Sequence, residues 1–70
     1  MGLYENVKTA CAKRNTNVFR LEADLGFPRG SIYKWDVNIP SIAKVKDVSE
    51  ALDVSMEELT RDVDFRRGEA

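Results

Sequence analysis

The side chains best suited to contacting a ligand or partner lie in residues 17–38, NVFRLEADLGFPRGSIYKWDVN. Arg29 and Lys34 carry positive charge, and Tyr33 carries a hydroxyl that donates or accepts a hydrogen bond. Gly30 leaves the backbone without a side chain. The apolar spacing predicts two short helices separated at Gly26, with these four residues on the outer face of the second. Such groups bind a partner rather than break bonds.

An enzyme requires a nucleophile with a base, or paired carboxylates in a cleft, and neither is evident here. The chain has no His, which is the commonest general base. Its one Cys, Cys11, allows neither a disulfide framework nor a zinc site and is expected to be a packing residue. Ser31 and Ser55 fit better as helix-surface and capping residues. We therefore expect no catalytic residue, no metal and no cofactor.

Seventy residues allow one domain. The net charge is −1, but residues 1–46 hold eight Lys/Arg and four Asp/Glu (+4), and residues 47–70 hold three and eight (−5). This asymmetry suggests an anionic partner at the basic end. The sequence shows no run long and apolar enough for a transmembrane helix and no secretory signal, so a cytoplasmic location is expected.

Capping residues divide the chain into five short helices with no strand, an all-α fold. The first is expected over residues 3–14 and the third over residues 28–37, beginning at Pro28. Asn17, Ser41 and Ser55 are suited to cap the second, fourth and fifth helices. Asn15, Gly26 and Asp53 are suited to the left-handed conformation that ends a helix.

Apolar periodicity predicts which faces of these helices are buried. The second helix is expected to bury Leu21, and the third to bury Ile32 and Trp35. The stripe predicted for the fourth helix consists of Ile42, Val45, Val48 and Leu52, with Ala51 beside it.

The segment LEADLGFPRGSIYKW, followed by SIAKVKDVSEALDVSMEEL, resembles the Xre/Cro/phage-repressor (lambda-repressor-like) helix-turn-helix family over residues 3–59. The resemblance implies a five-helix DNA-binding domain over residues 1–60, with the helix-turn-helix formed by helices two and three. It further implies a sequence-specific regulator of transcription, most simply a repressor of bacterial or phage origin, whose third helix reads the major groove of double-stranded DNA.

The same resemblance assigns roles to individual residues. Those expected to read bases are Arg29, Gly30, Tyr33 and Lys34. Those expected to contact the DNA backbone are Asn17, Val18, Ser31, Asn38 and Lys44. Arginine suits base reading because it can bond bidentately to guanine O6 and N7.

The chain departs from the family pattern at three positions. Val18 stands where a phosphate-contacting Gln is common, and Asn38 stands where the following loop usually has Gly. Asp36 lies near the DNA-facing end of the third helix. Its charge would repel phosphate unless the side chain is turned away or paired.

Operators read by such modules usually contain two half-sites about one DNA turn apart. We therefore expect a homodimer on an inverted repeat, formed in solution or only on DNA, and no small-molecule ligand. The fifth helix and the charged tail, residues 61–70, are expected to form the dimer contact through Val63 and Phe65. The alternative is a protein-interaction module of the same fold, antirepressor-like or antitoxin-like, which the acidic second half and Asp36 favour.

Overall fold

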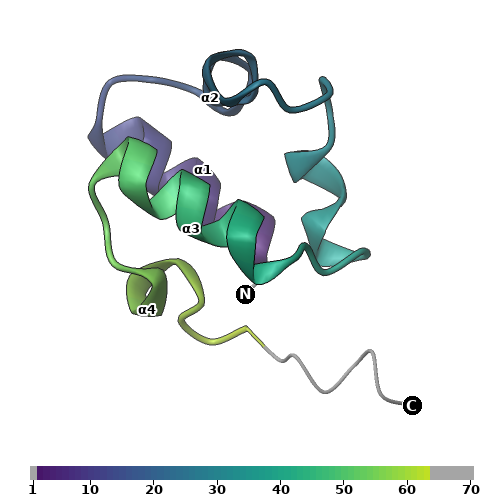
Figure 1. Cartoon of the computed structure of the whole chain (residues 1–70). Coiled ribbons are helices and arrows are strands. Elements are labelled where there is room, and N and C mark those ends of the chain that lie inside the picture. The colour runs from purple at the N-terminus through teal and green to yellow at the C-terminus, as the bar shows by residue number, and fades with distance from the viewer. Residues whose placement is uncertain (1, 64–70) are drawn as a thin grey trace.

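The computed structural model describes residues 2–63, in which four α-helices and one 3-10 helix form the regular structure and no strand occurs. The elements are α1 (Leu3–Lys13), α2 (Val18–Leu25), η1 (Ile32–Asp36), α3 (Ile42–Leu52) and α4 (Met56–Leu59). Helices α1 and α3 pack together in the middle of the molecule, with α2 above them, η1 to the right and α4 below (Figure 1). The all-helical prediction is thus confirmed for these residues.

Every element contributes to one apolar core. Its members are Leu3, Val7, Ala10 and Cys11 of α1, Leu21 of α2, Ile32 and Trp35 of η1, Val45, Val48 and Leu52 of α3, and Leu59 of α4. Short helices gain most of their stability from packing an apolar face, so this shared core holds the five elements together. Cys11 is buried in it as predicted, and the burial raises the pKa of its thiol.

The starts of three helices are capped as the sequence predicts. The side-chain oxygen of Asn17 accepts a hydrogen bond from the backbone N–H of Arg20 at 2.9 Å. The hydroxyls of Ser41 and Ser55 accept corresponding bonds at the starts of α3 and α4. Each cap satisfies one of the N–H groups that has no partner within its own helix.

The ends of α1, α2 and α3 also follow the prediction. Asn15, Gly26 and Asp53 have positive φ values of 58°, 73° and 53°. In each case the N–H of the following residue donates to the carbonyl five residues earlier, at 2.8–3.0 Å. This is the hydrogen bond of the Schellman motif, which turns the chain sharply at the end of a helix.

Two local predictions are wrong. The third helix was expected over residues 28–37, but only Ile32–Asp36 is helical, and as a 3-10 helix. Gly30 has φ +87°, which a right-handed helix does not permit, so the helix cannot run from Pro28 through this position. The second error concerns the buried stripe of α3, in which Ile42 is 74% exposed and Ala51 is exposed as well. Ile42 is the first residue of α3, beyond the part of the helix that the other elements cover.

Candidate nucleic-acid interface

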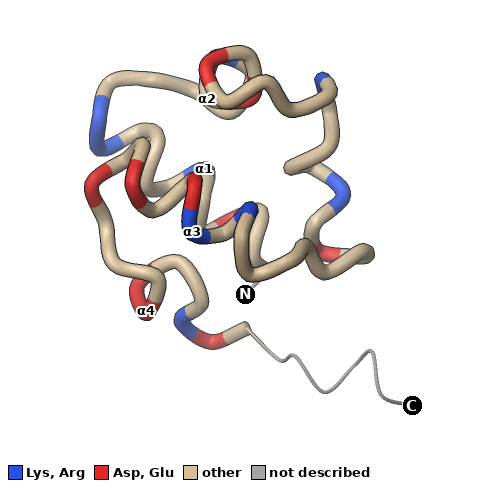
Figure 2. The backbone as a smooth tube through the Cα atoms, in the orientation of Figure 1, with Lys and Arg blue, Asp and Glu red and all other residues tan. Residues whose placement is uncertain are grey.

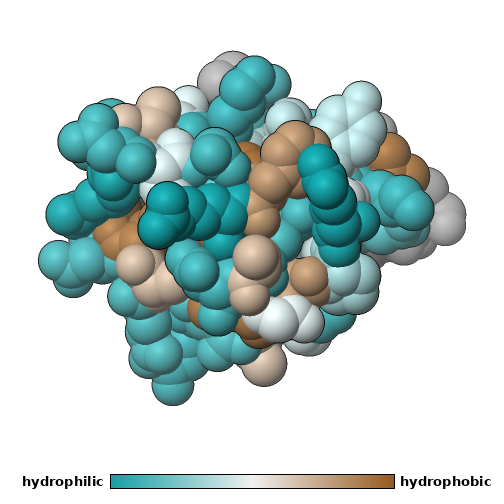
Figure 3. All heavy atoms as spheres, turned by 90° about the horizontal axis from the view of Figure 1, so that it is seen from above, coloured by the Kyte–Doolittle hydropathy of each residue, from teal (hydrophilic) through white to brown (hydrophobic). Residues whose placement is uncertain are grey.

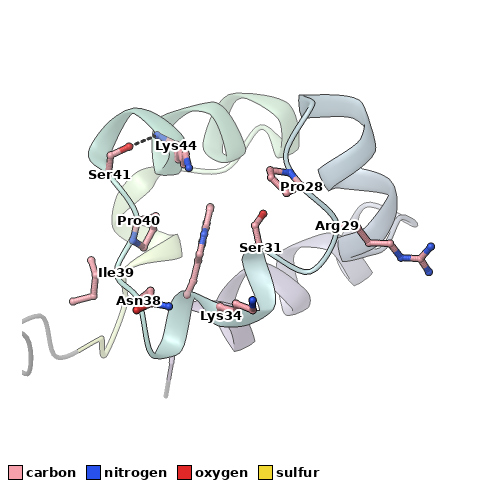
Figure 4. Close-up of a pocket in the computed structure, with 10 residues that line it drawn as sticks. Pro28, Arg29, Ser31, Lys34, Asn38, Ile39, Pro40, Ser41 and Lys44 are labelled. Atoms are coloured by element: carbon pink, nitrogen blue, oxygen red, sulfur yellow. Dashed lines mark hydrogen bonds between the residues drawn. The ribbon is translucent and has the colours of Figure 1, made fainter.

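A groove of about 400 Å³ opens between the segment that contains η1 and the first turn of α3 (Figure 4). Its charged lining consists of Arg29, Lys34 and Lys44. Its remaining lining consists of Pro28, Ser31, Trp35, Asn38, Ile39, Pro40 and Ser41. Three cations and no carboxylate therefore line the groove.

Five of the nine predicted site residues line this one groove: Arg29, Ser31, Lys34, Asn38 and Lys44. Ser31 and Lys44 point into the space between η1 and α3, whereas the Arg29 side chain extends outward from the turn (Figure 4). The Lys44 ammonium lies 6.0 Å from the centroid of the Phe27 ring, near the limit for a cation–π contact. The groove thus combines residues predicted to contact bases with residues predicted to contact phosphates.

The turn that carries Arg29 is held by a buried carboxylate. Glu22 of α2 is only 1% exposed, and its two carboxylate oxygens accept hydrogen bonds from the N–H groups of Gly30 and Ile32, both at 2.9 Å. Charge-assisted bonds of this kind are about twice as strong as neutral ones. Glu22 therefore fixes the backbone on both sides of Ser31, and one end of the groove with it.

Sequence reasoning missed Glu22, although the signal was present. Val18, Leu21 and Leu25 follow helical spacing, and Glu22 falls on the same face, four residues after Val18. A carboxylate inside an apolar stripe is buried only where donors meet it. The donors here belong to a different element, so the sequence of α2 alone did not reveal them.

Asp36, whose charge would repel phosphate unless turned away or paired, is hydrogen-bonded within the fold. Its Oδ1 accepts a hydrogen bond from the backbone N–H of Tyr4 at 2.8 Å, in the first turn of α1. Gly2, the N-cap residue of α1, offers no side chain for this purpose. The partly positive end of α1 thus faces the Asp36 charge, which does not line the groove.

The other predicted site residues lie outside the groove lining. Tyr33 is exposed but packs edge-on against Tyr4, with ring centroids 5.1 Å apart. Asn17 caps its own helix, and Val18 is half-buried against the core. A Cβ at Gly30 would meet no atom within 4 Å, so the backbone there is open to close approach. The positive φ is what requires glycine at this position.

The hydroxyl oxygen of Ser31 is enclosed and has no hydrogen-bond partner among the described residues. A buried polar group without a partner typically costs about 1–3 kcal/mol. The oxygen points from the turn into the space between η1 and α3 (Figure 4). The groove therefore already contains one polar group whose bonding is incomplete.

Acidic residues are concentrated elsewhere. Figure 2 shows those of α4 and of the loop before it on the opposite side of the molecule from η1. In residues 2–63 no group of three His, Cys, Asp or Glu side chains could hold a metal ion, and no helix has the length and apolarity needed to span a bilayer. The described surface therefore offers a cationic groove and an acidic region well apart from it.

Comparison with known proteins yields no match: no family model, no curated protein and no solved structure corresponds to this chain. What can be said of function therefore rests on the residues and their geometry.

Proposed function

We propose that this chain is a sequence-specific, double-stranded DNA-binding regulator of transcription that acts as a repressor of the phage-repressor or Cro type. The observation that carries the proposal is the groove lined by Arg29, Lys34 and Lys44 without a carboxylate. Positive charge that meets phosphates supplies most of the sequence-independent affinity for DNA. The resemblance over residues 3–59 supports the same function.

Two acidic side chains near the groove, Glu22 and Asp36, do not line it, and this supports the proposal. Glu22 and Asp36 belong to the same stretch as Arg29 and Lys34, and either could have cancelled a cation there. Both carboxylates instead accept backbone N–H bonds, one from the turn and one from α1. Among the described residues neither carboxylate lines the groove or forms an ion pair with one of its cations.

The proposed DNA-reading element differs from a regular recognition helix. It consists of the turn at residues 29–31 and the five-residue helix η1. A 3-10 helix rises about 2.0 Å per residue, so η1 is about 10 Å long. The major groove is about 12 Å wide and admits a helix. In this arrangement Arg29 and Lys34 approach base edges, and Asn38 and Lys44 face the DNA backbone. Ser31 was expected to contact the DNA backbone too, but its hydroxyl oxygen is enclosed and does not reach a phosphate.

The active form proposed here is a homodimer on an inverted repeat, one copy at each half-site. Of the interface residues expected from sequence, Val63 is half-buried against the core and Phe65 lies outside the described residues. Val37 and Ile42 are instead exposed, and each is next in the chain to a residue that lines the groove. We assign the dimer contact to these two residues. They fall far short of the ~800 Å² per partner of a stable interface, so the contact forms on DNA.

The experiment is selection of bound sequences from a random double-stranded DNA library, followed by titration of the selected site at several salt concentrations. We expect an inverted repeat and a slope of log K against log salt of about −4 to −5, as for four to six phosphates neutralised by a dimer. No enriched sequence, or affinity that does not depend on salt, would contradict the proposal.

A protein-interaction module is the second candidate, and one of its two supports is weaker than the sequence suggested. Asp36 favoured it as a charge unsuited to DNA, but that carboxylate is bonded to the start of α1. The acidic second half of the chain remains in its favour. This candidate would be favoured if the selection enriched no DNA sequence and if any affinity for DNA did not change with salt concentration.

A further inference from the structure

Phe19 is a large apolar side chain that the core does not use. It lies in the first turn of α2 and is 58% exposed. Seen from above in Figure 3, the molecule is mainly hydrophilic, with separate small apolar patches. A single exposed aromatic side chain is common on protein surfaces and does not by itself indicate a function. Phe19, however, contacts Arg29 of the groove.

The guanidinium carbon of Arg29 lies 4.7 Å from the centroid of the Phe19 ring. This distance is well within the range of a cation–π contact. Among the described residues Arg29 makes no ion pair and no side-chain hydrogen bond, so the ring is its only specific partner there. Phe19 therefore restricts where the Arg29 side chain points.

An arginine packed on an aromatic face keeps its N–H groups free, because they lie in the plane of the guanidinium. Bidentate bonding to guanine O6 and N7 uses two of those N–H groups and needs a fixed orientation. A free arginine on the surface would lose rotamer freedom on binding, whereas one already held against a ring loses less. The contact with Phe19 thus prepares Arg29 for the base.

We propose that Phe19 is a positioning residue that holds the Arg29 guanidinium in the orientation needed to read a guanine. This inference rests on the proposed function, because it requires DNA in the groove. It adds a residue of α2 to the specificity of the site, at a position that neither the apolar spacing nor the family resemblance singled out.

The test compares Phe19→Leu, which keeps an apolar side chain but removes the ring face, with Phe19→Tyr, which keeps the ring. Affinity is measured for the selected operator, for the operator with the Arg29-dependent guanine replaced by adenine, and for random DNA. That guanine is the position whose preference disappears in Arg29→Ala. For Phe19→Leu we expect the preference for guanine to fall about two- to fivefold, the range of an exposed cation–π contact. Phe19→Tyr should restore it.

Three readouts separate positioning from a structural role. Phe19→Leu should leave the thermal midpoint and the affinity for random DNA unchanged. It should also leave the affinity for the selected operator unchanged in the Arg29→Ala background, because the residue through which it acts is gone.

An unchanged guanine preference in Phe19→Leu, with a wild type that binds DNA, overturns this inference and leaves the proposed function intact. An equal loss on all DNA sequences overturns it too. A wild type that binds no DNA overturns the proposed function, and the inference with it.

Discussion

The carboxylate of Asp36 caps α1 by accepting a hydrogen bond at 2.8 Å from the N–H of Tyr4, which lies 32 residues earlier in the chain. Gly2 stands beside this contact, and a Cβ at position 2 would overlap the Asp36 carboxylate. The start of α1 and the end of η1 are therefore fitted to each other. One acid both supplies the missing cap and withdraws its charge from the groove.

Asp36→Ala should reduce the free energy of unfolding by about 0.5–2 kcal/mol, the usual effect of losing an N-terminal cap. Asp36→Asn should reduce the free energy of unfolding less, because the amide oxygen still accepts the hydrogen bond from Tyr4. Some loss remains, because the charge that faces the helix dipole is gone. Urea unfolding measures both. Asp47→Ala, which removes an exposed carboxylate on α3, is the matched control and should change stability by no more than about 0.5 kcal/mol.

Gly2→Ala tests the same fit from the other side. It should destabilise the wild type, since the new methyl group displaces the Asp36 carboxylate. In the Asp36→Ala background the same substitution should have little further effect, because the overlapping group is absent. Additive losses in the double variant would show that the two residues do not interact.

Among alanine substitutions of the acidic residues within positions 2–63, Glu22→Ala should be the most destabilising. It leaves the N–H groups of Gly30 and Ile32 without their acceptor, at a loss of about 2–4 kcal/mol. Glu22→Gln keeps one acceptor oxygen and should be intermediate. Urea unfolding gives the stability, and amide exchange at these two residues reports the turn itself. Equal stability of Glu22→Ala and the exposed control Glu50→Ala would contradict the role assigned to Glu22.

The sequence predicted the parts of the fold that depend on near neighbours. A cap such as Asn17 bonds to an N–H three residues away, so the residue and its position suffice to predict it. The left-handed turns at Asn15, Gly26 and Asp53 are local in the same sense. The inward faces of Ile32 and Trp35 followed from helical spacing and needed no knowledge of the partner element.

What the sequence did not predict depends on contacts between distant elements. The acceptor roles of Glu22 and Asp36 require α2, η1 and α1 to be in place first. Ile42 was misassigned because periodicity gives the face of a helix, but not how far that helix extends past its neighbours. Among the candidate site residues, the groove gathers five, while Tyr33 lies against Tyr4 because α1 passes beside η1.

Cys11 predicts a dependence of stability on alkaline pH. Burial raises the pKa of its thiol above the usual 9.0, so the unfolded chain loses this proton first as pH rises. The folded state is therefore less stable at alkaline pH. The stability that the buried, protonated thiol contributes is complete below the pKa of the unfolded chain and is lost as pH rises through the pKa of the folded chain. Urea unfolding from about pH 8 to about pH 10.5 should therefore show a steeper fall for wild type than for Cys11→Ala. Parallel curves would contradict this.

Because the dimer contact is assigned to the exposed residues Val37 and Ile42, two copies should bind cooperatively to an inverted repeat. The variant Val37→Ser/Ile42→Ser should bind a single half-site as the wild type does, since neither residue lines the groove. On the full repeat the two copies should bind independently, because the apolar contact between them is lost. Gel-shift titration of half and full sites measures this. A wild-type pattern for the double variant would place the dimer contact elsewhere.

Arg29 and Lys44 line the same groove, but replacing each by alanine should change DNA binding in a different way. Arg29→Ala should abolish the preference at one base position, at a loss of about 1–3 kcal/mol on the preferred sequence, because a bidentate contact to guanine distinguishes bases. Lys44→Ala should weaken binding to every sequence by the same factor and reduce the salt slope by about 1 per copy, because a phosphate contact carries no sequence information.

Lys8→Ala removes an exposed cation of α1 outside the groove and is the control for net charge. Competition titrations with single-base operator variants at two salt concentrations separate the two patterns. If Arg29→Ala behaved as Lys8→Ala, the base-reading role would belong to another residue.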